Sequence, residues 1–173
     1  MNHVCRLCAV SSADLNFPPR ILFQEARMAG QTPLHFVFYF AAPPEKVWEG
    51  FVSPESNRTI FGGAEFLADL KPGGLLQWFG PGPDGKRTVY VHGEVIKIEP
   101  PKLLQYTYSL GQSSMSSRVT VELVPETEAT QVTVTHDLWA DSDPTYALTA
   151  SGWPRVLSRL KTLIETGKTF KPH

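Results

Sequence analysis

The sequence is poor in cysteine, and what it has does not form a recognisable site. Its 173 residues contain two cysteines, Cys5 and Cys8, which form a single C-x-x-C pair near the amino end. A tetrahedral zinc site needs two more ligands at a suitable spacing, and a redox pair normally follows a strand, which is missing upstream of Cys5. We therefore favour an inert pair of thiols over a redox or zinc site, and we expect no cofactor.

Charge and long apolar runs are also scarce. A net charge of -1 supplies no field to hold a polyphosphate, which argues against a nucleic-acid partner. No stretch approaches 18 uninterrupted apolar residues, and the amino end lacks the pattern of a signal peptide, so we expect no membrane span and a cytoplasmic protein. Hydrophobic residues make up 42% of the chain, too many for a disordered one.

The length predicts one domain with tails at both ends. A chain of 19.2 kDa can bury about 70% of its unfolded surface, enough for one core. Residues 1–32 show no useful apolar period, so we interpret them as a poorly ordered tail, with a domain over residues 33–168 and a short tail over residues 169–173. Met28 lies just before the first convincing strand, so translation starting there is a further hypothesis.

One strand and two short helices are expected at the start of the domain. Residues 35–40 read HFVFYF, a run of aromatic and β-branched side chains typical of a strand. Pro44 pre-sets helical φ for a short helix. Ser53 followed by Pro54 has the form of an N-cap and first helical residue, and predicts a second helix that ends near Ile60.

Five further strands are expected after these helices. They read GGLLQWFG, KRTVYVHGEVIKI, KLLQYTYSL, SRVTVELV and TQVTVTHDL, with turn-rich segments between them. Their short connections favour an antiparallel meander over units with crossover helices. In the last two strands apolar and polar residues alternate, which predicts one dry face and one wet face.

The chain closes with one amphipathic helix. Its apolar residues recur at helical spacing in a single stripe, formed by Trp153, Val156, Leu157, Leu160, Leu163 and Ile164. Gly167 stands where a glycine commonly ends a helix, so we expect a helix over residues 150–166. Pro154 leaves its start uncertain by about a turn, because proline is comfortable only near a helix N-terminus. The stripe should lie across the dry face of the sheet.

A glycine-rich segment imitates a phosphate-binding loop. Residues 80–87 read GPGPDGKR, which fits G-x-x-x-x-G-K and lacks only the final Ser or Thr. Pro81 and Pro83 remove two of the backbone N–H donors that such a loop needs, and the segment joins two strands. We interpret it as a hairpin loop, and expect no nucleotide there.

The order of these elements resembles the SRPBCC superfamily, whose members have START-like or helix-grip folds. The chain is similar to the family of homologues of the activator of the heat-shock-protein ATPase in AAPPEKVWEGFVSPE, FLADLKPGGLLQW, GEVIKIEPPKLLQYTY, SRVTVELVPETEATQVTVTHDLW and GWPRVLSRLKTLIETG, over residues 35–167. Ile60 departs from the pattern, since relatives often have Trp there. The resemblance implies an α+β helix-grip fold, with a curved antiparallel sheet of six to seven strands wrapped around the long C-terminal helix.

The same resemblance implies a cavity between the sheet and the long helix, which in relatives holds apolar small molecules. Strand parity places His136 on the dry face of the sheet. There it is either a core residue whose ring nitrogens are hydrogen-bonded, or a polar group that faces a bound molecule. A metal site is the third alternative, although no second metal-binding residue is evident nearby. Tyr106 and Tyr108 share a parity, so both phenols are candidates for the same face.

Apolar residues complete the candidate lining. Phe61, Trp78 and Trp153 are large aromatics that serve either as core packing or as walls of a pocket. Val121 belongs to the dry face and Leu157 to the helical stripe. The direction of His92 is not determined, because both faces of its strand are mixed. Together these give nine candidate residues for ligand binding: Phe61, Trp78, His92, Tyr106, Tyr108, Val121, His136, Trp153 and Leu157.

Three functions remain open at this point. The first is binding of a small hydrophobic or aromatic molecule, such as a lipid, in the cavity. The second is a cyclase or hydrolase that uses the same cavity, although the sequence contains no evident pair of acid and base and so favours a protein that is not an enzyme. The third is a co-chaperone-like module that contacts a chaperone through its outer surface. Both a monomer and a homodimer are compatible with the sequence.

Overall fold

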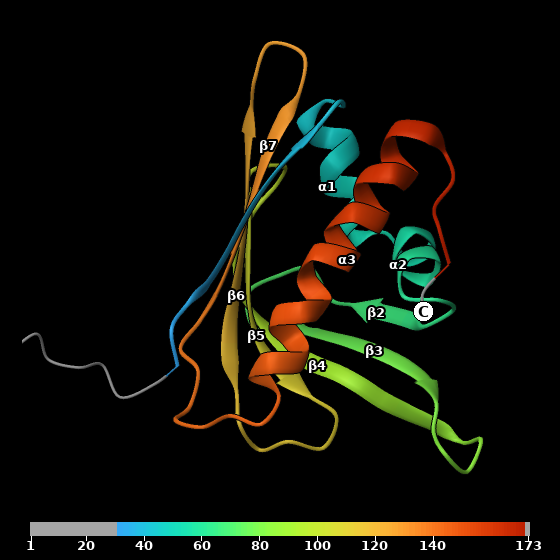
Figure 1. The fold of residues 1–173 in the computed structure, drawn as a ribbon, viewed down its shortest axis with the longest axis vertical. Coiled ribbons are helices and arrows are strands. Elements are labelled where there is room, and N and C mark those ends of the chain that lie inside the picture. Colours follow the sequence, from blue (N-terminus) through green and yellow to red (C-terminus); the bar gives the residue numbers. More distant parts are fainter. Residues whose placement is uncertain (1–30, 172–173) are drawn as a thin grey trace, which may run out of the picture.

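The computed structural model describes residues 31–171, which form one sheet and three helices (Figure 1). The predictions for Cys5, Cys8 and Met28 lie outside the described residues. In chain order the elements are β1 (Leu34–Phe40), α1 (Pro44–Val52), α2 (Pro54–Ile60), β2 (Glu65–Ala68), β3 (Leu75–Pro81), β4 (Arg87–Glu99), β5 (Leu103–Leu110), β6 (Ser117–Pro125), β7 (Thr130–Asp137) and α3 (Tyr146–Thr166).

The sheet has seven strands in the order β1-β7-β6-β5-β4-β3-β2, and each neighbouring pair is antiparallel. After β1 the chain passes through α1 and α2 to the far edge of the sheet, then returns strand by strand until β7 pairs with β1. The predicted meander and the helix-grip fold are confirmed. β2 was not predicted from its alternation, because a strand of four residues is too short to show a period; its pairing of Phe66 with Trp78 holds it in place.

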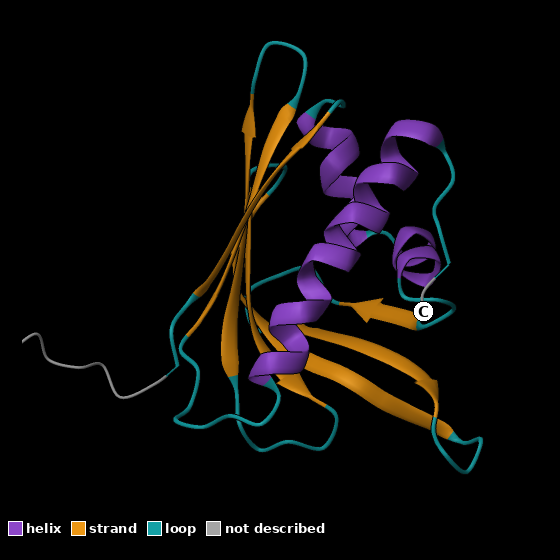
Figure 2. Cartoon of the chain, viewed as in Figure 1, coloured by secondary structure: helices purple, strands orange, loops and turns teal. Residues whose placement is uncertain are grey.

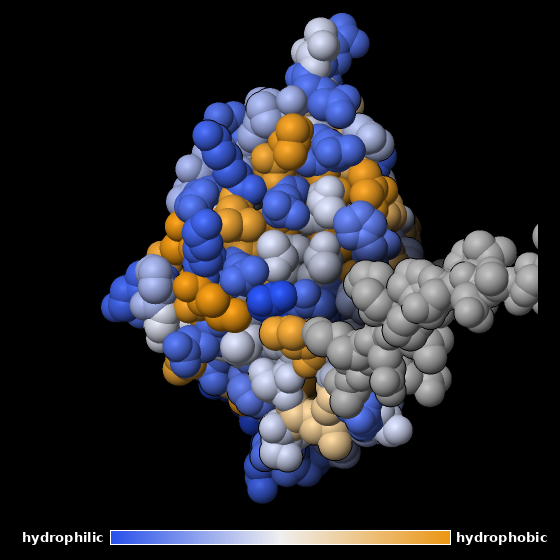
Figure 3. Space-filling view, turned by 90° about the vertical axis from the view of Figure 1, so that its left-hand side faces the viewer, coloured by the Kyte–Doolittle hydropathy of each residue, from blue (hydrophilic) through white to orange (hydrophobic). Residues whose placement is uncertain are grey.

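All three helices lie on one side of the sheet (Figure 2). The face beneath them carries the buried side chains of β6 and β7, including Val119, Val121 and Val134, as the alternation predicts. Figure 3 looks onto the opposite face, where polar residues predominate and apolar ones are scattered. The core therefore lies between the inner face of the sheet and α3.

The long helix begins earlier than predicted. α3 starts at Tyr146, which places Pro154 at its ninth position. Pro154 cannot donate a backbone hydrogen bond to the turn before it, but Tyr146 anchors the start of the helix. Its ring packs edge-on against Trp139 with centroids 5.1 Å apart, and its hydroxyl donates to the Thr32 carbonyl at 3.0 Å. Gly167 ends the helix with φ of 74°, as predicted.

The two short helices are confirmed as well. The Ser53 hydroxyl accepts a hydrogen bond from the backbone N–H of Ser56 at 3.1 Å, so Ser53 is the N-cap of α2 and Pro54 its first residue. α2 contacts β2, whereas α1 contacts β6, and both short helices lie next to α3 (Figure 1).

Candidate functional site

A cavity of about 260 Å³ lies between the first half of α3 and strands β3, β4 and β5. Five of the residues expected from the sequence line it: Phe61, Trp78, Tyr106, Tyr108 and Trp153. It is partly open to solvent, and Leu148, whose side chain is 64% exposed, lies at its rim. A second cavity of about 30 Å³ adjoins it and shares all of these aromatic walls except Tyr108.

Trp78 forms one wall of both cavities and is held by α2. Its indole nitrogen donates to Asn57 Oδ1 at 2.9 Å, and the Asn57 amide nitrogen donates to the carbonyls of Phe51 and Ser53 at 2.8 and 2.9 Å. Asn57 is 2% exposed and has all of these partners within the protein. This network orients the Trp78 ring, which packs against Phe66 with centroids 4.6 Å apart.

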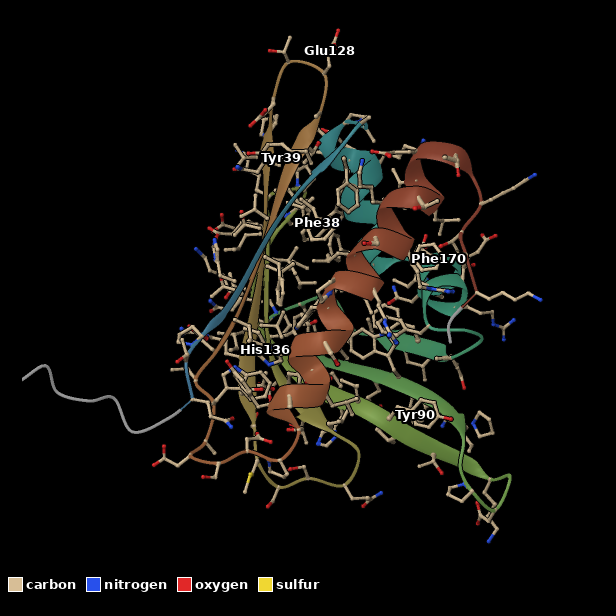
Figure 4. The ribbon with its side chains drawn as sticks, viewed as in Figure 1. Phe38, Tyr39, Tyr90, Glu128, His136 and Phe170 are labelled. Atoms are coloured by element: carbon tan, nitrogen blue, oxygen red, sulfur yellow. The ribbon has the colours of Figure 1, made fainter. Side chains whose placement is uncertain are left out.

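Trp153 forms the wall opposite the sheet and is held by His136. The indole nitrogen of Trp153 lies 3.0 Å from His136 Nδ1, while His136 Nε2 lies 2.7 Å from the Ser117 hydroxyl. Figure 4 shows His136 between the sheet and the first half of α3. His136 is fully buried, and this burial lowers the pKa of its imidazole to about 4, although the nearby Asp137 and Asp143 carboxylates oppose the change.

These hydrogen bonds determine the tautomer of His136. An indole N–H can only donate, so Nδ1 accepts and the proton resides on Nε2, which donates to Ser117. The Ser117 hydroxyl in turn donates to the Tyr108 carbonyl at 3.2 Å. In this arrangement His136 does not receive a proton from Ser117, so the two residues are not a nucleophile and its base.

Three hydroxyl groups belong to residues of the cavity wall. Burial raises the pKa of both phenols, and each tyrosine is therefore a neutral donor. The Thr149 hydroxyl opposes this rise at Tyr108, although the two groups do not reach hydrogen-bond geometry. Thr149 Oγ1 is buried and has no hydrogen-bond partner in the described chain. The cavity thus combines aromatic walls with a few polar groups, which is typical of ligand pockets.

Four of the nine candidate residues lie elsewhere. Val121 lines only the smaller cavity. His92 follows the cavity-lining Val91 on β4, and successive side chains on a strand point to opposite faces, so His92 faces outward. His136 stands behind Trp153, and Leu157, at 0% exposure, is packed in the core. His92, His136 and Leu157 therefore do not line the cavity, and His136 takes the first of its alternatives, a core residue with both ring nitrogens hydrogen-bonded. A role in ligand binding stays a prediction for the five candidates that line the larger cavity.

Six lining residues were not among the candidates. They are Val91, Leu110, Leu148, Thr149, Gly152 and Val156. Val156 was visible in the helical stripe, and Thr149 lies four residues before Trp153, on the same helix face. The sequence signal for Leu148 and Thr149 was lost because Pro154 suggested a helix that starts after them.

Comparison with known proteins identifies the family. The family model described as "Activator of Hsp90 ATPase homolog 1-like protein" matches residues 41–165. The chain belongs to this family. That match covers most of the domain and confirms the resemblance drawn from the sequence. No protein of curated function matches the chain.

Solved structures show the same fold in several organisms. The chain is similar to DynU16, from the dynemicin biosynthetic locus, with 24% identity and a TM-score of 0.68 over 80% of this chain and 49% of that one, so it spans about half of DynU16. It is similar to the Aha1 dimer from Colwellia psychrerythraea, with 19% identity and a TM-score of 0.66 over 80% and 99% of the two chains. It is also similar to PFC0360w, an HSP90 activator from Plasmodium falciparum, with 19% identity and a TM-score of 0.65 over 78% and 96%.

Two further properties concern residues 31–171 only. No group of three or more His, Cys, Asp or Glu side chains in this range is arranged to hold a metal ion. No helix in the same range has the length and apolar character needed to cross a membrane.

Proposed function

We propose that the protein binds a small apolar or aromatic molecule in the cavity beneath α3. The observation that carries the proposal is an aromatic-walled space of about 260 Å³ that the side chains of the helix and sheet leave unfilled. A dry protein cavity of roughly 150 Å³ holds one benzene molecule. A cavity of this size therefore suits a molecule with about two fused rings.

The expected affinity from apolar burial alone is weak. Burying ten carbon atoms contributes about 8 kcal/mol, at about 0.8 kcal/mol for each methylene equivalent. Association costs at least about 4 kcal/mol, so burial alone leaves at most about 4 kcal/mol and a dissociation constant of about 1 mM or weaker. Shape and the few polar groups then decide which molecule is preferred.

Gly152 allows the cavity to be closed by one substitution. It shares a helix face with Thr149 and Val156, which also line the cavity, and a Cβ built on Gly152 meets no atom within 4 Å. In Gly152→Leu the new side chain should occupy this space without clashing. Ser151→Leu places the same side chain at an adjacent exposed position and is the matched control.

The test is ligand-observed NMR with naphthalene as the probe. Saturation transfer from the protein to naphthalene is expected for the wild type and for Ser151→Leu, and should be lost in Gly152→Leu. Circular dichroism checks that all three proteins are folded. The proposal is overturned if the folded wild type gives no transfer, or if Gly152→Leu gives as much as the wild type.

The two other functions receive less support from the described residues. An enzymatic role needs an acid or base at the cavity, for which His136 and the tyrosines are the candidates. The two ring nitrogens of His136 are engaged by Trp153 and Ser117 behind the cavity wall, and burial raises the pKa of Tyr106 and Tyr108 further from neutral pH. An Hsp90-activating role rests on family membership and on folds under 25% identical. Measuring the ATPase rate of Hsp90 with and without the protein tests that role directly, and a clear stimulation would favour it over ligand carriage.

A further inference from the structure

We propose that the ligand is a neutral molecule with a hydrogen-bond acceptor, and that the Thr149 hydroxyl donates to this acceptor. The inference rests on the proposed function and adds the chemical class of the ligand. It identifies Thr149 as a residue that determines specificity. Three observations carry it: the missing partner of Thr149, the uncharged wall, and the surplus of donors on that wall.

Thr149 differs from the other helical threonines of this chain. A threonine inside a helix commonly donates its hydroxyl to the carbonyl four residues earlier. Thr59, Thr162 and Thr166 do so, with oxygen-to-oxygen distances of 3.0, 2.8 and 2.8 Å. Thr149 makes no such bond within the described chain, although its side chain is buried. A buried hydroxyl without a partner destabilises the folded protein, so its orientation requires an explanation.

The cavity wall is uncharged. None of the lining residues is Asp, Glu, Lys, Arg or His. The same burial that raises the pKa of Tyr106 and Tyr108 would penalise a charged ligand, because a carboxylate that leaves water here meets no cation. A neutral ligand avoids this penalty.

The wall offers donors rather than acceptors. Tyr106 and Tyr108 also line the cavity, and each keeps its proton because burial raises its pKa. With Thr149 this makes three residues of one cavity wall that carry a neutral hydroxyl group. A carbonyl or ether oxygen of the ligand has two lone pairs and can accept hydrogen bonds from these hydroxyls. A ligand that has only donors would leave the hydroxyls without an acceptor.

The experiment uses three bicyclic probes of nearly equal shape. 2-Acetylnaphthalene is neutral and carries an acceptor, 2-isopropenylnaphthalene is neutral and lacks one, and 2-naphthoate carries a negative charge. Dissociation constants are measured at pH 7.5 by calorimetry on the full chain. For the wild type we expect the ketone to bind about tenfold more tightly than the alkene, and the carboxylate to bind most weakly of the three.

The variants isolate the Thr149 hydroxyl. Thr149→Val keeps the shape of the side chain and should lower ketone affinity about tenfold, to that of the alkene, while leaving alkene affinity unchanged. Thr149→Ser keeps the hydroxyl and should retain the preference for the ketone. Thr162→Val, on the same helix but away from the cavity, is the matched control and should change none of the three affinities.

The possible results separate this inference from the proposed function. Equal affinities for ketone and alkene, or an unchanged ketone preference in folded Thr149→Val, overturn the role of Thr149 but leave ligand binding intact. Tightest binding of 2-naphthoate overturns the neutral class. If none of the three probes binds the folded wild type, the proposed function itself fails.

Discussion

The indole nitrogen of Trp153 donates a hydrogen bond to Nδ1 of His136 across 3.0 Å. The two residues come from α3 and β7, so this bond ties the helix to the sheet beside the cavity. His136 is therefore a positioning residue for the Trp153 wall. It can hold Trp153 in this way only while it is neutral, because a protonated imidazole has no free lone pair at Nδ1.

The first prediction concerns the pH dependence of stability. The pKa of His136 is lowered from 6.5 to about 4 in the folded protein, so between these values the unfolded chain binds a proton at this residue and the folded one does not. The free energy of unfolding should fall by about 3 kcal/mol from this group as pH decreases from 6.5 to 4, and the group should add no further dependence above that window. Urea denaturation at pH 7.5, 5.5 and 4.5 measures the fall.

His136→Gln removes the titration and identifies the source of this dependence. The difference in unfolding free energy between wild type and variant should narrow as pH decreases through the same window. NMR of the His136 ring provides an independent check, since its chemical shifts should stay constant from pH 7.5 to about 5. A ring that titrates near pH 6.5 would contradict the prediction.

The second prediction compares two helical glycines. Gly152→Ala should stabilise the protein by about 0.5–1 kcal/mol, because alanine favours the helix and the new Cβ meets open space. Gly50→Ala in α1 should destabilise it by about 1–3 kcal/mol, since its Cβ would lie 2.6 Å from Ile164 Cδ1 and 2.9 Å from Leu160 Cδ1. Chemical denaturation of both variants checks the signs, and a loss of stability in Gly152→Ala would show that its position is not open.

The third prediction concerns Arg159, which joins α3 to α2 and to the C-terminal segment. Its guanidinium donates to the carbonyls of Thr59 and Ile60, both at 2.7 Å, and to that of Phe170 (Figure 4 labels Phe170). Arg159→Met leaves these carbonyls without their donor. The free energy of unfolding should fall by about 2–4 kcal/mol.

Arg155→Met is the control for the loss of one positive charge from α3. Arg155 lies on the exposed face of the same helix, so Arg155→Met should change stability by no more than about 0.5 kcal/mol. Thermal denaturation of the two variants in parallel separates the lost contacts from the lost charge. Equal effects of the two substitutions would contradict the structural role of Arg159.

Much of the fold follows from local patterns in the sequence. Alternation on β6 and β7 identifies the buried face, because neighbouring side chains of a strand must point to opposite sides. The Ser53-Pro54 pair marks the start of α2, and Gly167 marks the end of α3, because both depend on backbone conformation within a single turn. The start of α3 did not follow, since Tyr146 is anchored by contacts with Trp139 and Thr32, which lie outside the helix and leave no mark on its residue pattern.

Residue patterns were sufficient to show which side of the sheet and which stripe of the helix are apolar, and the candidates they gave include five residues of the cavity wall. Which inward-facing groups reach the cavity depends on how the helix and the sheet pack together. Strand parity gives the direction of His136 but not its depth, and Trp153, from a distant helix, lies in front of it. The unpartnered hydroxyl of Thr149 and the open space beside Gly152 likewise depend on the distance between α3 and the sheet. Side chains from both the helix and the sheet determine that distance, so neither element's sequence gives it alone.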